Sequence, residues 1–222
     1  MAQEAPAARV VLRPLATPLP LGFLALALAT TVFSAVQLGW VEPDQGRIAA
    51  ITALAATVPL QLLASVMGFL TRDPVAATGM GVLSGTWAVA GFTTYSLAPG
   101  TTSSGLGVLL VVAGIAMLVP AAAAVGSKVM PALVMTVAAT RFATTGVYEM
   151  TGSADWEAVA GWVGILLAAV AFYTALALEL EGAQESTVLP VGRRGPGRSA
   201  MDGEGPLEPA DLAEEAGVRP QL

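Results

Sequence analysis

The chain has 222 residues, of which 55% are hydrophobic and only 12% are charged, and its mean hydropathy is +0.72. This composition is far from that of a water-soluble domain and predicts a membrane protein. The absence of Cys and His excludes disulfides, thiolate chemistry, typical zinc sites and His-based catalytic triads. Nothing in the composition predicts a metal, a cofactor or a nucleic-acid partner.

Six apolar stretches follow one another along the chain, each about as long as the roughly 20 residues that an α-helix needs to cross a bilayer core. The first is too long for a signal peptide and has no clear cleavage site, so we interpret it as a retained span. The short connection at 126–128 predicts an antiparallel helical hairpin. The predicted fold is therefore all-α, with six transmembrane helices at residues 21–41, 48–70, 75–98, 105–125, 129–150 and 158–178.

The basic residues predict the orientation of the six spans, because both termini of such a protein share one side. Only Arg47 falls on the side opposite the termini. Cytoplasmic connections are enriched in Lys and Arg, so both termini are expected in the cytoplasm, with the spans in the inner (plasma) membrane. Trp40 and Trp162 are expected at the outer interface, near acidic residues that face outward. The basic residues on the terminus side are Arg9, Arg13, Arg72, Lys128, Arg193, Arg194, Arg198 and Arg219.

Three segments are expected along the chain: a cytoplasmic N-terminal segment at 1–16, the membrane domain at 17–192 and a cytoplasmic tail at 193–222. The tail is rich in Gly, Pro and charged residues, without the apolar periodicity of a packed segment, which predicts disorder. It also holds most of the acidic excess behind the net charge of −6. A regulatory or partner-binding tail is the alternative to a merely solvated one.

Two short proline-glycine strings bracket the six spans. One is Thr17-Pro-Leu-Pro-Leu-Gly22 and the other is Thr187-Val-Leu-Pro-Val-Gly192. At these strings, and at the Ala-Gly-Trp-Val-Gly segment of 160–164, the chain resembles the acetate uptake transporter family, the succinate-acetate permeases. Thr17 stands where this family has Asn, and its hydroxyl is expected to cap the first helix. The motif residues matched here are Pro18, Pro20, Leu21 and Gly22.

The resemblance implies a channel or transporter for acetate or similar small monocarboxylates, with succinate as a further candidate. It also implies a homo-oligomer, a hexamer in the family, surrounded by membrane lipids. The family narrows its pore with an apolar and aromatic ring from helices one, three and five. Matched position by position, that ring falls on Leu26, Leu83 and Ala138. These side chains are smaller than the family's aromatic ones, so the constriction is expected to be wider or drier.

Arg141 is the one charge deep within a predicted span. A charge at that depth is costly, about 2.5–3.5 kcal/mol on insertion scales, so it normally faces protein or water and usually has a function. Helical spacing places Thr144, Thr145 and Tyr148 on its face, whereas Glu149 is expected at the mouth. The alternative is a structural arginine that binds carbonyl groups or a neighbouring subunit. The candidate substrate-binding residues are Arg141, Thr17, Ser84, Thr144 and Tyr148.

The middle of every predicted span lacks Asp, Glu and His, the groups through which proton-coupled transporters commonly relay protons. This favours passage of the anion, or of the acid itself, without a dedicated proton carrier. An enzyme is not expected, because an intramembrane enzyme needs a nucleophile with a base at membrane depth. The alternative function is a non-transporting membrane scaffold or sensor that acts through the charged tail.

Overall fold

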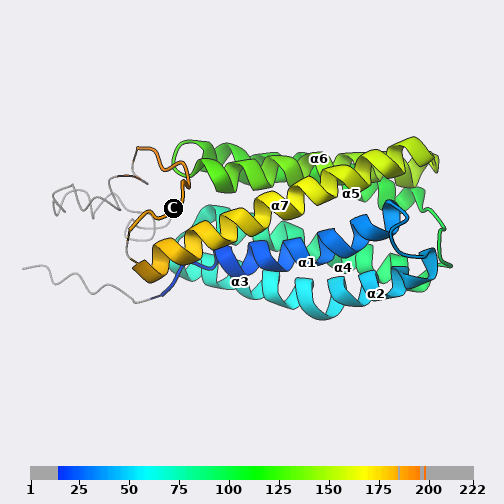
Figure 1. Cartoon of the computed structure of the whole chain (residues 1–222), viewed down its shortest axis with the longest axis horizontal. Coiled ribbons are helices and arrows are strands. Elements are labelled where there is room, and N and C mark those ends of the chain that lie inside the picture. The colour runs from blue at the N-terminus through cyan, green and yellow to red at the C-terminus, as the bar shows by residue number, and fades with distance from the viewer. Residues whose placement is uncertain (1–14, 185, 196–197, 199–222) are drawn as a thin grey trace, which may run out of the picture.

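The protein is described here by a computed structural model covering residues 15–184, 186–195 and 198. These residues form a bundle of six membrane-length segments in which consecutive segments run in opposite directions (Figure 1), as the sequence predicted. The second and third segments are each built from several short helices. In chain order the segments are α1 (Leu19–Gln37); η1 (Pro43–Gln45), α2 (Gly46–Thr52), η2 (Ala53–Thr57) and α3 (Val58–Thr71); η3 (Val75–Gly79) and α4 (Met80–Ser96); α5 (Ser104–Val125); α6 (Val129–Thr151); and α7 (Ala154–Gln184).

Five of the six segments are both long and apolar enough to cross a membrane. The sixth, α6, has 23 residues, which at about 1.5 Å per residue is the length of a bilayer core. It is more polar than the others because it carries Arg141, Glu149 and five threonines. The least apolar helix of a membrane bundle is the one expected to face its interior, so α6 is the first place to look for a functional site.

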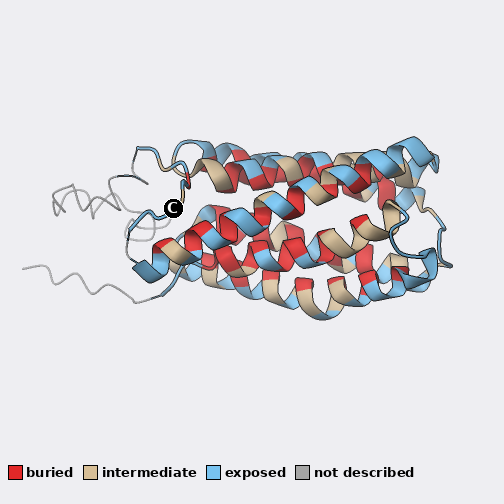
Figure 2. Cartoon of the chain, in the orientation of Figure 1, coloured by how far each residue is buried: buried red, intermediate tan, exposed pale blue. Residues whose placement is uncertain are grey.

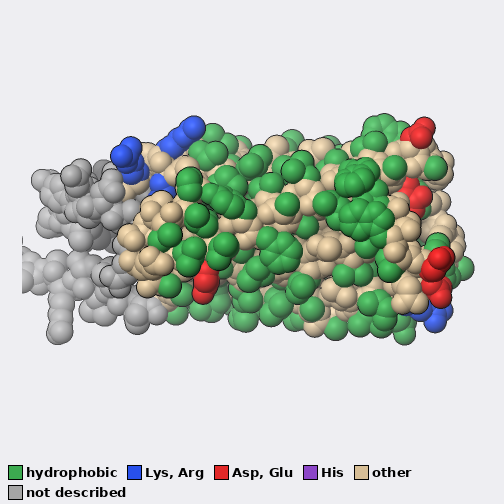
Figure 3. Space-filling model, in the orientation of Figure 1, with side chains coloured by type: hydrophobic (Ala, Val, Ile, Leu, Met, Phe, Trp, Pro, Cys, Tyr) green, Lys and Arg blue, Asp and Glu red, His purple; other side chains and the backbone are tan. Residues whose placement is uncertain are grey.

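The surface of the bundle is that of a multi-pass membrane protein. Buried residues face the centre of the bundle and exposed residues face outward (Figure 2), where large apolar side chains such as Phe69 and Val119 are 69% and 67% exposed. Apolar side chains cover the middle of the face shown in Figure 3, and charged side chains gather toward its two ends. We call the end that carries Glu42, Asp44 and Glu157 the acidic end and the other the basic end.

Small residues bring α5 and α6 together as the antiparallel hairpin that the short connection predicted. A Cβ at Gly146 would lie 2.7 Å from the backbone oxygen of Gly107, and one at Gly114 would lie 2.8 Å from that of Ala139. Lipid tails are as apolar as side chains, so membrane helices associate through close packing more than through the hydrophobic effect. The glycines of this hairpin therefore set the distance between its helices.

Replacing Gly146 with alanine is expected to lower the apparent melting temperature by several degrees. The new Cβ would overlap the Gly107 carbonyl, and overpacking of this kind typically costs about 1–3 kcal/mol. The matched control is Gly85→Ala in α4, where a Cβ meets no atom within 4 Å and helix propensity alone favours alanine. Equal melting temperatures for the two variants in detergent would contradict the close packing of α5 on α6.

Two segments are π-helical: η2 interrupts the second span, and η3 begins the third. Pro59 is the second residue after η2 and cannot donate a hydrogen bond to the preceding turn, so the wider π turn accommodates the proline that the sequence places there. In η3 the Ala77 carbonyl accepts a hydrogen bond of 2.6 Å from Ser65 Oγ, which ties this segment to α3. Neither π segment was predicted, because proline indicates a kink without indicating its form.

The start of α1 corrects one expectation. The helix begins at Leu19, the Pro18 carbonyl accepts the Gly22 N–H at 3.2 Å, and no side chain caps the helix. The expected Thr17 cap is therefore wrong. Pro20 explains why the helix start tolerates this: it has no N–H, so one of the donors that a cap would satisfy is missing.

The second proline-glycine string folds back onto the bundle. Residues 186–195, which we call the strap, bind the start of α6: Val129 N–H donates to the Gly192 carbonyl at 3.1 Å, and Arg194 N–H donates to the Ser127 carbonyl at 3.0 Å. The Arg193 guanidinium pairs with the buried carboxylate of Glu181. The backbone contacts of the strap thus reach Arg194. Residues 1–14 and most of the predicted tail lie outside the described residues.

Candidate functional site

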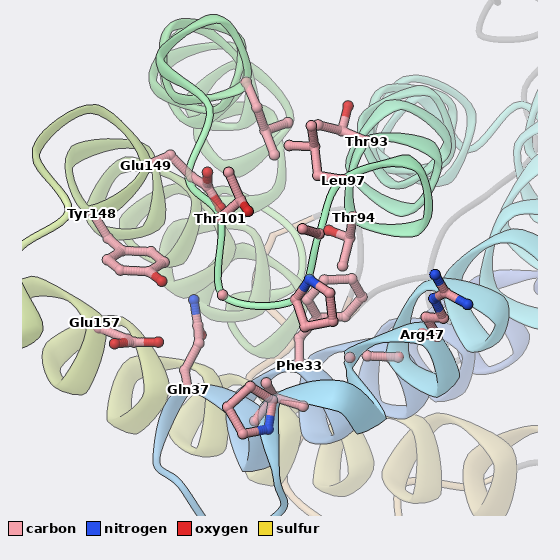
Figure 4. Close-up of a pocket in the computed structure, with 18 residues that line it drawn as sticks. Phe33, Gln37, Arg47, Thr93, Thr94, Leu97, Thr101, Tyr148, Glu149 and Glu157 are labelled. Carbon is pink, nitrogen blue, oxygen red and sulfur yellow. The ribbon is translucent and has the colours of Figure 1, made fainter.

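Two neighbouring cavities lie one behind the other between the acidic end and the interior of the bundle. The outer cavity has a volume of about 130 Å³ and is lined by α1, α2, α4, α6 and the 97–101 loop (Figure 4). The inner cavity, of about 40 Å³, lies deeper, and even it exceeds the roughly 10–15 Å³ that one water molecule needs. The two cavities are neighbours, because they share Phe33, Gln37, Thr94, Leu106 and Glu149 as lining residues.

The outer cavity has charged residues on two opposite sides. Tyr148, Glu149 and Glu157 line one side, and Arg47 lines the other (Figure 4). Glu149 also has a structural role, because its Oε2 accepts the Ser103 N–H at 2.8 Å and so holds the start of α5 against α6. Glu149 thus lies at the mouth, as the sequence predicted, and it reaches the inner cavity as well.

Arg141 lines the inner cavity and is only 3% exposed. Its Nη1 donates to Thr145 Oγ1 at 2.6 Å, and its Nη2 donates to Gln37 Oε1. Room for the guanidinium comes from α7, where a Cβ at Gly164 would lie 2.7 Å from Arg141 Nε. Within the described part of the chain, no carboxylate forms an ion pair with Arg141. The site is therefore a buried cation with neutral hydrogen-bond acceptors, an arrangement that attracts an anion.

Aromatic rings form the walls of the inner cavity. The ring centroids of Phe33 and Trp87 are 5.3 Å apart, and those of Trp87 and Phe142 are 6.0 Å apart. The indole N–H of Trp87 is buried and has no hydrogen-bond partner. Apolar walls with a few placed donors are typical of a site for a small organic ligand. Here the donors are an unpaired N–H and a guanidinium, which suit a carboxylate bearing a short alkyl group.

The predicted apolar ring lies beyond the inner cavity. Leu26, Leu83 and Ala138 are each 0% exposed, belong to one buried apolar cluster and line neither cavity. Their helices α1, α4 and α6 all run from the basic end toward the acidic end. Close contacts of Gly22 with Met80 and of Gly79 with Met135 show that these parts of the three helices lie at one level. Leu26, Leu83 and Ala138 each come about one helical turn after that level. The three side chains are therefore at one level, roughly one turn nearer the basic end than Arg141.

The other sequence-predicted residues lie in different places. Tyr148 lines the outer cavity. Ser84 instead donates to the Val58 carbonyl at 3.0 Å, which joins α4 to α3. Thr144 donates to backbone carbonyls of its own helix and lines neither cavity. Thr17 lines a third cavity, of about 370 Å³, at the basic end. Pro18, Pro20, Leu21 and Gly22 form the first turn of α1 and the residue before it, at that same end.

The contact of Arg141 with Gln37 and the aromatic walls of the inner cavity were not predicted from the sequence. Gln37 belongs to α1 and is 104 positions from Arg141, so no local spacing relates the two. Trp87 and Phe142, by contrast, each follow a predicted ring residue by four positions. That spacing places them one helical turn from Leu83 and Ala138, and it could have identified the aromatic wall.

Fold and site define a multi-pass membrane protein with a cavity that ends at a buried cation. The chain belongs to the GPR1/FUN34/yaaH family, which its sequence matches over residues 2–192. This match confirms the resemblance to the acetate uptake transporter family. No individually curated protein gives a significant sequence match.

The fold is similar to that of a solved structure described as "Structure of the bacterial acetate channel SatP". The TM-score is 0.71 at 22% sequence identity, and the match covers 80% of this chain and 99% of that one. At this identity the similarity shows that the two proteins share the six-helix membrane fold.

Proposed function

We propose that the protein is a channel that passes acetate, or similar small monocarboxylates, across the membrane. One observation carries the proposal: Arg141 is buried at the inner end of a cavity that leads in from the acidic end, and no carboxylate pairs with it in the described chain. Two findings support the substrate class and favour transport over an enzymatic role. The chain belongs to the GPR1/FUN34/yaaH family, and the solved structure with a similar fold is described as an acetate channel.

The carboxylate enters the outer cavity and binds the Arg141 guanidinium, with the Trp87 N–H as a further donor. Its alkyl group lies against the aromatic walls. The anion then crosses the ring of Leu26, Leu83 and Ala138 and leaves through the cavity at the basic end, which Lys128 lines. The ring disfavours bare inorganic ions, because an apolar constriction offers nothing to replace their hydration shell.

Monocarboxylates are the favoured substrates. Only one guanidinium lines the inner cavity, whose walls are otherwise mainly apolar. The second carboxylate of succinate would have to face those walls or lie near Glu149, and an unpaired carboxylate is costly in either place. Succinate is therefore a poorer substrate than acetate.

The membrane setting follows the charges. Arg72, Lys128, Arg193 and Arg194 lie at the basic end, whereas Arg47 lies at the acidic end. The positive-inside rule then places the basic end and both termini in the cytoplasm, and the acidic end outside the inner membrane. The family resemblance supports a homo-oligomer, a hexamer, in which each subunit has its own pore.

Uptake of radiolabelled acetate by liposomes containing the purified protein tests the proposal. Uptake well above that of protein-free liposomes is expected, with inhibition by unlabelled propionate and little inhibition by chloride or succinate. No acetate uptake by the folded protein would refute the substrate assignment. The scaffold alternative is tested by removing residues 199–222, which leaves the Arg193–Glu181 pair intact. A channel keeps its flux after this truncation.

A further inference from the structure

We propose that Gln37 sets the affinity of the channel, because its side-chain amide takes the place of the substrate carboxylate at Arg141 and must be displaced. This inference rests on the proposed function, since it assumes that the anion binds Arg141. It assigns a specificity-determining role to a residue that the apolar ring and the sequence motifs do not include.

Arg141 has two side-chain hydrogen-bond partners in the described chain: Thr145, whose position is fixed, and Gln37, which can be exchanged for a ligand. Thr145 lies one turn along the same helix, and its hydroxyl also donates to the Arg141 carbonyl at 2.7 Å, so its position is set by α6. Gln37 comes from α1 and contacts the guanidinium only through its amide oxygen, which accepts from Nη2. A carboxylate that binds two guanidinium nitrogens needs this Nη2, so Gln37 competes with it directly.

Gln37 also has room to move. It is the last residue of α1, and two residues later Gly39 adopts a left-handed backbone conformation with φ of +66°. Its side chain extends into the outer cavity between Phe33 on one side and Tyr148 and Glu157 on the other (Figure 4). Because the residue lines both cavities, its amide can leave Arg141 and rotate into the outer cavity without displacing the helix.

The chemistry of the exchange favours carboxylates. A carboxylate carries a full negative charge, whereas the amide oxygen of Gln37 is neutral, so Coulomb attraction to the guanidinium and a two-point contact favour the carboxylate over the amide. A halide gains only a single-point contact and has no planar pair of oxygens to match the guanidinium, so Gln37 discriminates against it.

Two substitutions of Gln37 test the inference in opposite directions. Gln37→Leu removes the competitor, and loss of one hydrogen bond from a charged donor predicts a KM for acetate that is lower by about tenfold. Gln37→Glu places a permanent carboxylate beside Arg141, and the resulting buried ion pair is expected to lower the maximal rate at least about tenfold. The control is Gln45→Glu, the same charge change at an exposed position of the acidic end that lines neither cavity.

Uptake is measured as a function of acetate concentration for these three variants, the wild type and Arg141→Met, together with melting temperatures to confirm folding. A lower KM for Gln37→Leu, a lower maximal rate for Gln37→Glu and unchanged kinetics for Gln45→Glu support the inference. A purely structural Gln37 would lose activity in both variants. If both Gln37 variants match the wild type while Arg141→Met is inactive, the inference fails and the proposed function stands. If Arg141→Met also transports normally, the anion path itself is wrong.

Discussion

Replacement of Arg141 with methionine is expected to lower acetate uptake at least tenfold while the protein still folds. Methionine keeps much of the length of the side chain but removes the charge that offsets dehydration of the carboxylate. The loss of a charge-assisted hydrogen bond in a site shielded from water is typically worth about 1.5–3 kcal/mol, or a factor of about 10 to 100. Uptake into proteoliposomes at equal protein content measures the effect.

The matched control is Arg47→Met, which removes an arginine from the outer cavity. Arg47 is exposed, so salt screens its charge, and its loss is expected to change uptake less than twofold. Arg141→Lys separates charge from geometry, because lysine keeps the charge without the planar pair of donors, and intermediate uptake is expected. Wild-type uptake by folded Arg141→Met would make Arg141 a structural residue.

Enlarging Ala138 to phenylalanine is expected to block the channel at the ring while acetate still binds. Ala138 is fully buried at the level of Leu26 and Leu83, so a phenyl ring there fills any space through which a methyl group passes. The maximal rate should fall at least tenfold, with little change in KM because Arg141 is one turn away. Overpacking costs about 1–3 kcal/mol, so a modest loss of thermal stability is also expected.

Leu133→Phe is the control for this block, because Leu133 belongs to the same helix but is 42% exposed on the outside of the bundle. It should transport as the wild type does. A normal rate for Ala138→Phe would show that the anion does not pass the level of Ala138. Loss of binding together with loss of rate would indicate instead that the substitution disrupts the inner cavity.

Much of the fold could be predicted from the sequence, because a bilayer imposes a simple rule on helix length and polarity. The short 126–128 connection predicted the α5–α6 hairpin. Arg72, Lys128, Arg193 and Arg194, which were predicted on the side of the termini, lie at one end of the described bundle. The ends of helices were less accurate: α7 begins at Ala154 and ends at Gln184, well beyond the expected 158–178. Hydropathy marks the membrane core, but a helix continues past it where polar residues still form backbone hydrogen bonds.

The site was only partly predictable. Arg141 could be identified because a charge at membrane depth is costly and usually has a function. Tyr148 could be identified because helical spacing places it on the same face of the helix as Arg141. Ser84 and Thr144 could not be separated from true cavity residues, because the sequence does not say whether a buried hydroxyl bonds a backbone carbonyl or faces a cavity. The Gln37 contact depends on how α1 packs beside α6, which no local pattern reports.

The measurement that tests the anion path most directly uses the absence of native cysteine. Thr94→Cys places a thiol on a residue that lines both cavities, and Phe92→Cys places one on the same helix, where Phe92 is 66% exposed on the outside. A negatively charged thiol reagent added from the acidic end should abolish acetate uptake by the Thr94→Cys variant only, and acetate should slow the reaction. Unchanged uptake after complete modification of that variant would show that the anion does not pass through these cavities.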